Sequence, residues 1–185
     1  MTRILALSGS LRAGSFNTAL ARAAQANAPD GVTVDVATLH GIPLYDADDE
    51  KADGIPPAVE ALREKILACD GLLLVTPEYN NGMPGVFKNG IDWLSRTPKD
   101  LFAARPVALI GASPGGFGTV LSQNHWLPVL KTLGTDLWSG GRLMVSRANT
   151  LMDAQGELAD PPTIELLKTF VEGFAKFVAT SRAPG

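Results

Sequence analysis

The feature that most constrains the fold is a series of short, continuous apolar runs that alternate with helical patterns. Three of these runs are Ile4–Leu7, Leu72–Val75 and Val107–Ile110. Such runs are typical of parallel strands that helices cover on both faces. A less regular run, Leu143–Val145, predicts another strand, and the alternating segment Val32–Val36 predicts one at a sheet edge. The chain is therefore expected to form an α/β sheet.

Ala-rich or amphipathic segments between the apolar runs predict the helices. They are expected over Asn17–Asn27, from Pro56-Pro57, from Pro84, over Val120–Leu133 and along the apolar stripe Ile164–Val178. Pro128 is expected to kink or divide the fourth of these, because proline removes a hydrogen bond inside a helix. The acidic stretch from Gly41 to Ile55 is expected to be an irregular surface excursion.

This alternation of strands and helices implies right-handed crossovers between parallel strands. It predicts a flavodoxin-like three-layer sandwich, a single domain over residues 1–185 with a five-stranded parallel sheet of order 2-1-3-4-5. Ligands of such sheets bind at the carboxyl ends of the strands, where the strand order reverses. The loops 9–17, 76–85 and 111–119 should therefore converge on one site.

Composition narrows the class of protein. The 185 residues suit one domain, and the net charge of -3 argues against a nucleic-acid partner. No apolar run approaches the roughly 20 residues that span a bilayer, and the first residues do not resemble a secretory signal. The one cysteine, Cys69, excludes an internal disulfide framework, so a cytoplasmic location is expected. The two histidines fall in different regions, and no metal site is expected.

The first of the three loops has the chemistry of a phosphate site. Ser10, Ser15 and Asn17 offer side-chain donors near a helix start, and Arg12 adds a permanent charge. A helix cap with a solvated arginine explains the same residues equally well. The Rossmann fingerprint is absent because Leu11 replaces its second glycine, and a Walker A loop would need lysine at the position of Ser15. A triphosphate is therefore disfavoured, whereas a phosphomonoester such as that of FMN needs no such lysine.

The second loop, 76–85, is stiffened by two prolines and two glycines. An isoalloxazine ring needs a flat slot and amide groups along one edge. Tyr79 can supply an aromatic wall and the backbone from Glu78 to Asn80 can supply the amides. The competing interpretation is an ordinary connector with Pro84 at the start of a helix.

The third loop carries the pattern G-x-S-x-G around Ser113, which is also typical of serine hydrolases. Such a hydrolase needs an acid and then a histidine after the serine. His125 is the one histidine after Ser113, and no Asp or Glu lies between them. A glycine loop that packs against a ring is therefore the favoured interpretation.

Taken together, these segments resemble the NADPH-dependent FMN reductase family, which includes bacterial quinone and chromate reductases. The resemblance covers nearly the whole chain. Its motifs are Gly9-Ser10-Leu11-Arg12-x-x-Ser15-x-Asn17, Ile42-Pro43-Leu44-Tyr45-Asp46, Thr76-Pro77-Glu78-Tyr79-Asn80, Pro84-Gly85-x-x-Lys88-Asn89-x-Ile91-Asp92-Trp93 and Ser113-Pro114-Gly115-Gly116.

The resemblance implies an oxidoreductase that uses bound FMN to pass electrons from NADH or NADPH to a small-molecule acceptor such as a quinone, free flavin or chromate. A flavodoxin-like electron carrier is the alternative. No catalytic side chain is implied. The implied FMN-binding residues are Ser10, Arg12, Ser15, Phe16 and Asn17 at the phosphate, Pro77, Glu78, Tyr79 and Asn80 at the ring, and Ser113, Pro114 and Gly115 closing the site.

The resemblance also implies a homodimer or homotetramer built from paired helices. Trp93, Leu94, Trp126 and Leu127 are candidates for that contact or for the core, while Lys88, Asn89, Asp92 and Trp93 are expected to be structural or at a subunit contact. The segment His125-Trp126-Leu127-Pro128 departs from the family pattern and is expected to break the helix of the dimer contact.

Overall fold

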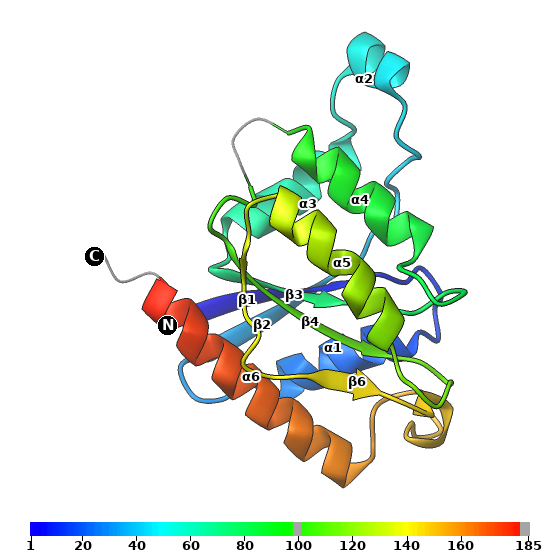
Figure 1. Cartoon of the computed structure of the whole chain (residues 1–185), viewed down its shortest axis with the longest axis vertical. Helices are drawn as coiled ribbons and strands as arrows, with labels where there is room; N and C mark the ends of the chain where they lie inside the picture. Colours follow the sequence, from blue (N-terminus) through cyan, green and yellow to red (C-terminus); the bar gives the residue numbers. More distant parts are fainter. Residues whose placement is uncertain (98–100, 182–185) are drawn as a thin grey trace.

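The computed structural model describes residues 1–97 and 101–181 (Figure 1). The strands are β1 (Thr2–Ser8), β2 (Val32–Ala37), β3 (Gly71–Val75), β4 (Pro106–Ala112), β5 (Asp136–Leu137) and β6 (Leu143–Val145). The helices are α1 (Phe16–Ala26), α2 (Ala47–Asp53), α3 (Pro57–Leu67), α4 (Gly85–Ser95), α5 (Val120–Thr132) and α6 (Pro161–Ser181), with a short 3-10 helix η1 (Ala148–Thr150).

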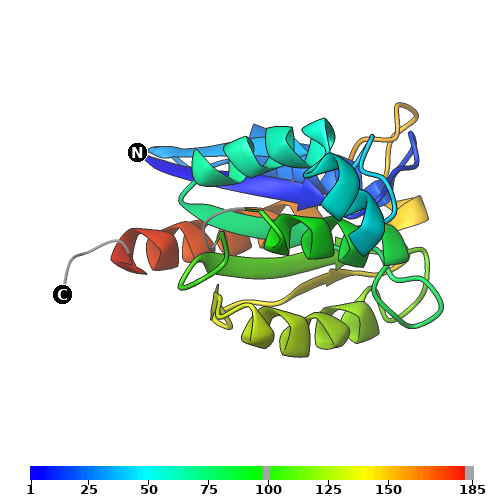
Figure 2. The same ribbon diagram turned by 90° about the horizontal axis from the view of Figure 1, so that it is seen from above.

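The strands form one parallel sheet in the order β2-β1-β3-β4-β5, which confirms the flavodoxin-like order expected from the sequence. Helices α3, α4 and α5 lie on one face, and α1 and α6 on the other (Figure 2). Strand β3 illustrates why the central runs are continuously apolar. Leu73 and Val75 pack under α1 and α6, while Leu72 and Leu74 pack under α3 and α4.

The outer strand beyond β4 differs from the expected single strand, because it consists of two pieces. Leu137 pairs with Val107, and Leu143 pairs with Ile110. Only residues 108–109 lie between these pairs on β4, whereas residues 138–142 lie between them on the outer strand. The excess cannot pair, so the chain bulges and divides the strand into β5 and β6.

Helix α5 runs without division through Pro128, so the expected break in this helix is wrong. Pro128 and Asn124 are both exposed, so the carbonyl that loses its helical partner can bond to water. Trp93, Leu94 and Trp126 are buried inside the chain, and Leu127 is exposed. The first three residues therefore belong to the core rather than to a subunit contact.

The excursion after β2 is exposed, as expected, but it is not wholly irregular, because residues 47–53 form α2. Asp46 begins this helix, since its carboxylate accepts the Asp48 N–H at 2.8 Å. Acidic residues also fill the first turn, where the helix dipole favours negative charge. Helix α2 stands out from the body of the molecule (Figure 1).

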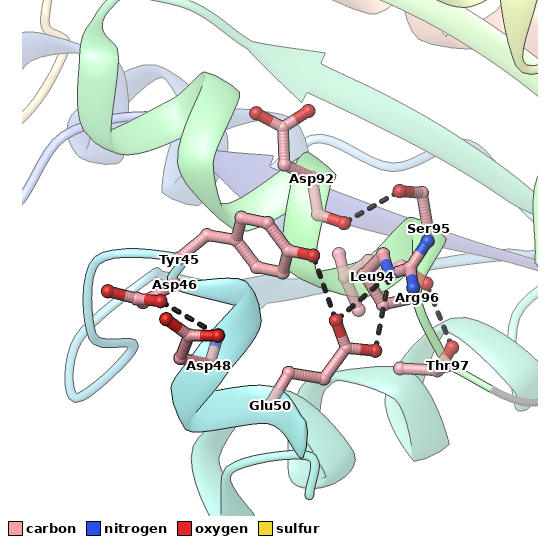
Figure 3. Close-up of polar contacts among 9 residues, drawn as sticks. All are labelled: Tyr45, Asp46, Asp48, Glu50, Asp92, Leu94, Ser95, Arg96 and Thr97. Atoms are coloured by element: carbon pink, nitrogen blue, oxygen red, sulfur yellow. Dashed lines mark hydrogen bonds and ion pairs between the residues drawn. The ribbon is translucent and has the colours of Figure 1, made fainter. Parts of the chain in front are cut away.

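A polar cluster fastens this excursion to the end of α4 (Figure 3). The Tyr45 hydroxyl donates to Glu50 at 2.9 Å, and Arg96 Nε donates to the same carboxylate at 3.0 Å. Both hydrogen bonds lower the pKa of Glu50, and the bond to Glu50 raises the pKa of Tyr45. Upstream, the Pro43 carbonyl accepts from Asn89 at 2.7 Å and from Trp93 at 3.0 Å. Asn89 and Trp93 therefore have the structural role expected as one of two alternatives.

Candidate functional site

A pocket of about 560 Å³ lies at the carboxyl ends of β1, β3 and β4, where the sheet order predicts a ligand. Its lining brings together the three loops that were expected to converge. Of the twelve residues predicted for the site, all but Asn80 and Gly115 line it. The lining residues are Ser10, Arg12, Ser15, Phe16, Asn17, Pro77, Glu78, Tyr79, Ala112, Ser113, Pro114 and Asn149.

The first loop combines a helix cap with an anion-binding geometry. Ser15 caps α1, since its hydroxyl accepts the Thr18 N–H at 3.2 Å. A cap of this kind satisfies one of the first backbone N–H groups of a helix and leaves others without a partner in the helix. The Phe16 and Asn17 N–H groups are therefore placed to bind an anion at the positive end of α1. The two interpretations of this loop are compatible.

Arg12 brings the positive charge of the pocket. Its guanidinium carbon lies 4.9 Å from the centre of the Phe16 ring. A guanidinium over an aromatic face gains about 0.5–1 kcal/mol at an exposed site. This contact holds the Arg12 side chain beside the start of α1. The stacking on Phe16 also fixes the plane of the guanidinium and so the directions of its N–H groups.

Asn17 has a different role from the one expected for its side chain. Its Nδ2 donates to the Ala112 carbonyl at 2.8 Å, and its Oδ1 accepts the Ala112 N–H at 2.9 Å. The amide therefore completes both backbone hydrogen bonds of Ala112 in the buried interior. Asn17 ties the first loop to the end of β4, and only its backbone N–H remains for a ligand.

The second loop closes in a tight turn that carries Asn80 away from the pocket. Tyr79 and Gly82 exchange two backbone hydrogen bonds of 3.0 Å. Asn80 and Asn81 between them have φ values of 50° and 62°, as in a type I′ turn, which asparagine tolerates better than most residues. Tyr79 is 51% exposed at the edge of the pocket, where its ring is accessible to a ligand.

The third loop is braced by Ser113. The Ser113 hydroxyl donates to the Gly118 carbonyl at 2.6 Å and accepts the Gly115 N–H at 3.2 Å. The Gly115 carbonyl accepts the Arg147 N–H at 3.0 Å, which draws Gly115 out of the pocket toward the segment after β6. These contacts give the serine a structural role and agree with the rejection of a hydrolase.

Ala112 and Asn149 line the pocket although they were not predicted from the sequence. Asn149 lies in η1, soon after β6, whose carboxyl end reaches the same edge of the sheet. The convergence rule therefore pointed to this loop as well. Ala112 carried no signal, because an alanine at the end of an apolar run looks like any other strand residue.

The chemistry of the pocket changes from one end to the other. Hydroxyls, Arg12 and the start of α1 suit a phosphate, while Pro77, Tyr79 and Pro114 suit a flat ring. A volume of about 560 Å³ is within the range of cofactor sites.

Among residues 1–97 and 101–181, no group of three His, Cys, Asp or Glu side chains could hold a metal ion. No helix in this described part is long and apolar enough to cross a membrane.

Comparisons with known proteins agree with this arrangement. Residues 2–150 match the model of the NADPH-dependent FMN reductase family. The chain is 43% identical to an NAD(P)H-dependent FMN reductase of Pseudomonas aeruginosa over 97% of both chains. It is 38% identical to a quinone reductase of Escherichia coli over 95% of both chains.

A solved structure supports the same assignment. The flavoenzyme NAD(P)H:(acceptor) oxidoreductase FerB of Paracoccus denitrificans superposes with a TM-score of 0.85 at 30% identity, covering 97% of this chain and 98% of that one. These similarities confirm the oxidoreductase class and the FMN and NAD(P)H dependence that the resemblance implied. The chain therefore belongs to the NADPH-dependent FMN reductase family.

Proposed function

We propose that the pocket holds FMN with its phosphate between Arg12 and the start of α1, and its ring between the second and third loops. The observation that carries this proposal is the convergence of a cationic, donor-rich end and an aromatic, proline-lined end in one pocket. The backbone from Glu78 to Tyr79 is the source of amide groups for the ring edge. The side chain of Asn80 has no role in this proposal, because Asn80 lies in the Tyr79–Gly82 turn and does not line the pocket.

FMN, when bound, supplies the transfer of electrons from a reduced nicotinamide to an acceptor. The residues of the chain bind and orient that group. Arg12 and the α1 N–H groups hold an anion, and Tyr79 and Pro114 form the edges of a slot that is open to a second planar molecule. No side chain of the pocket is assigned as an acid or a base, since the electron transfer needs none from the protein.

Quinones are the acceptors best supported by the names of the relatives. The Escherichia coli relative is named a quinone reductase, and a Burkholderia relative, 36% identical, is named a 2-hydroxy-1,4-benzoquinone reductase. Free flavin is a second acceptor, from the name of the Pseudomonas aeruginosa relative. Chromate is a third, expected from the sequence resemblance. A slot with an exposed aromatic side chain at its edge suits a flat acceptor better than a tetrahedral oxyanion.

The direct test combines a spectrum with a turnover assay. The purified protein, or the protein mixed with FMN and freed of excess, is expected to show the absorption bands of a bound flavin. It is then expected to oxidise NADPH or NADH continuously with a soluble quinone and no partner protein. Failure to bind FMN would refute the proposal, whereas binding without turnover would favour an electron carrier.

We further propose that the chain is a single domain over residues 1–185 that assembles as a homodimer or homotetramer in the cytoplasm. Since Trp93, Leu94 and Trp126 are in the core, the contact must use other residues. We propose the exposed face of α5 for this contact, because three exposed apolar side chains lie on this helix or just before it: Leu127, Leu121 and Phe117. Light scattering of the purified protein, with Leu127→Asp as the variant, tests the assembly and the face.

A further inference from the structure

His40 lies outside the pocket and contacts the loop that forms its phosphate end. It follows β2, and its exposed ring bridges two segments of the chain. Nδ1 lies 2.9 Å from the Thr38 hydroxyl, and Nε2 lies 3.1 Å from the Leu11 carbonyl oxygen. Leu11 directly precedes Arg12, so this ring holds the peptide that leads into the cationic residue of the site.

The protonation of the ring follows from its partners. A carbonyl oxygen can only accept, so Nε2 must carry a proton and donate a hydrogen bond to the Leu11 carbonyl. Nδ1 then accepts from the Thr38 hydroxyl in the neutral ring, and donates to the hydroxyl oxygen in the charged ring. The contact with Leu11 is therefore retained in both protonation states, and Thr38 fixes the ring orientation.

The contact with Leu11 also orients Arg12 N–H. In a trans peptide the carbonyl and the N–H of the same plane point in opposite directions. Because His40 draws the Leu11 carbonyl outward, the Arg12 N–H points to the inner side of the loop. There it lies 3.4 Å from Ser10 Oγ, a pocket residue, which is longer than an ordinary N–H···O bond. This N–H is thus aimed inward and only weakly engaged.

We propose that His40 is a positioning residue for the cofactor phosphate. It keeps the Leu11–Arg12 peptide in the orientation that presents the Arg12 N–H, together with Ser10 Oγ, to a phosphate. The proposal rests on FMN binding in the pocket, as proposed above. It assigns His40 to the phosphate end alone, since the ring end is formed by residues of the second and third loops.

The test compares FMN with riboflavin, which has the same ring and no phosphate. Flavin-free protein is titrated with each compound while flavin fluorescence is recorded. His40→Ala is expected to weaken FMN binding about three- to tenfold, the effect of one neutral hydrogen bond, and to leave riboflavin binding unchanged. His40→Gln, whose side-chain amide can donate to the Leu11 carbonyl, is expected to restore most of the FMN affinity.

Two further variants sharpen the test. Thr38→Val removes the group that orients the ring and is expected to weaken FMN binding less than His40→Ala does. His125→Ala removes the other histidine of the chain, which is exposed on α5 and outside the pocket lining, and is expected to bind both compounds as the wild type does. Urea unfolding of each variant shows whether the fold itself has changed.

The possible outcomes separate the two proposals. If the wild type binds neither FMN nor riboflavin, the proposed function fails. If the wild type binds FMN but His40→Ala binds it equally well, or loses FMN and riboflavin affinity to the same extent, the role of His40 is overturned. A selective loss of FMN affinity that His40→Gln repairs supports it.

Discussion

The carboxylate of Glu78 accepts the backbone N–H of Ser122 at 3.0 Å, so the loop after β3 caps the helix after β4. The same Oε2 accepts the Leu121 N–H at 2.9 Å. Ser122 in turn joins its hydroxyl to that of Thr76 at 2.8 Å, in the buried strand end that leads to Glu78. The second loop and α5 are therefore held together by both a charged cap and a buried hydroxyl pair.

Replacement of Glu78 is expected to loosen this junction. Glu78→Ala leaves the first N–H groups of α5 without their cap and is expected to cost about 1 kcal/mol of unfolding free energy. Glu78→Gln keeps an acceptor oxygen and is expected to lose less. Urea unfolding measures both. Glu172→Ala, which removes an exposed carboxylate paired with Lys176 inside α6, is the control and is expected to change little. Equal stability of Glu78→Ala and the wild type would contradict the capping role.

Asn17 makes the corresponding junction between the first loop and β4. In Asn17→Ala the buried N–H and carbonyl of Ala112 both lose their partner, at about 1–3 kcal/mol for each unsatisfied group. Asn27→Ala is the matched control, because its amide makes a single, partly exposed bond to the Ala23 carbonyl. We expect a clearly larger loss of unfolding free energy for Asn17→Ala. Similar losses of unfolding free energy for both variants would show that the two Asn17–Ala112 hydrogen bonds stabilise the fold no more than the single Asn27 bond does.

The sequence predicted the fold better than it predicted the directions of side chains. The strand order followed from continuous apolar runs such as Leu72–Val75, because burial on two faces leaves a direct mark on composition. The loop residues Asn80 and Gly115 were predicted for the site and lie outside its lining. Their directions depend on the turn at Tyr79–Gly82 and on the bond from Arg147 N–H, which no single residue type reveals.

Gly9 shows the same limit in another form. It begins the loop 9–17, which was expected to converge on the site, and the first family motif. In the structure its N–H donates to the Val75 carbonyl at 2.9 Å, and a Cβ at this position would lie 2.0 Å from Phe87 Cδ1. The glycine is thus required by the Phe87 ring of α4, which lies 78 residues away in the sequence and is brought to Gly9 by the fold.

Gly9→Ala tests this packing. The added methyl collides with a fully buried ring, and overpacking of this kind costs about 1–3 kcal/mol or more. Phe87→Leu makes room at its own cost, so the double variant is expected to be more stable than the sum of the two single losses predicts. Thermal or urea unfolding of the four proteins gives the coupling. Strict additivity would show that Phe87 is not the obstacle.

The polar cluster of Tyr45, Glu50 and Arg96 is expected to shift the pKa values of Glu50 and Tyr45. Hydrogen bonds from Tyr45 and Arg96 lower the pKa of Glu50, so its contribution to stability is complete above its unfolded pKa and is lost as the pH falls through the folded value. The Glu50 hydrogen bond also raises the pKa of Tyr45. NMR titration of Glu50 and ultraviolet titration of Tyr45 check both directions. Arg96→Ala is expected to move the Glu50 pKa upward, and an unchanged value would contradict the assigned cause.

Arg12 is the residue whose loss should affect FMN binding most. Bonds to charged groups contribute about 1.5–3 kcal/mol, so Arg12→Ala is expected to weaken FMN binding roughly ten- to hundredfold. Arg12→Lys keeps the charge but loses the planar fork and its stacking on Phe16. Its FMN affinity is therefore expected to lie between those of the wild type and Arg12→Ala. Titrations at low and high salt check the cause, because the loss on Arg12→Ala should shrink as salt screens the charge. Unchanged affinity in Arg12→Ala would place the phosphate elsewhere.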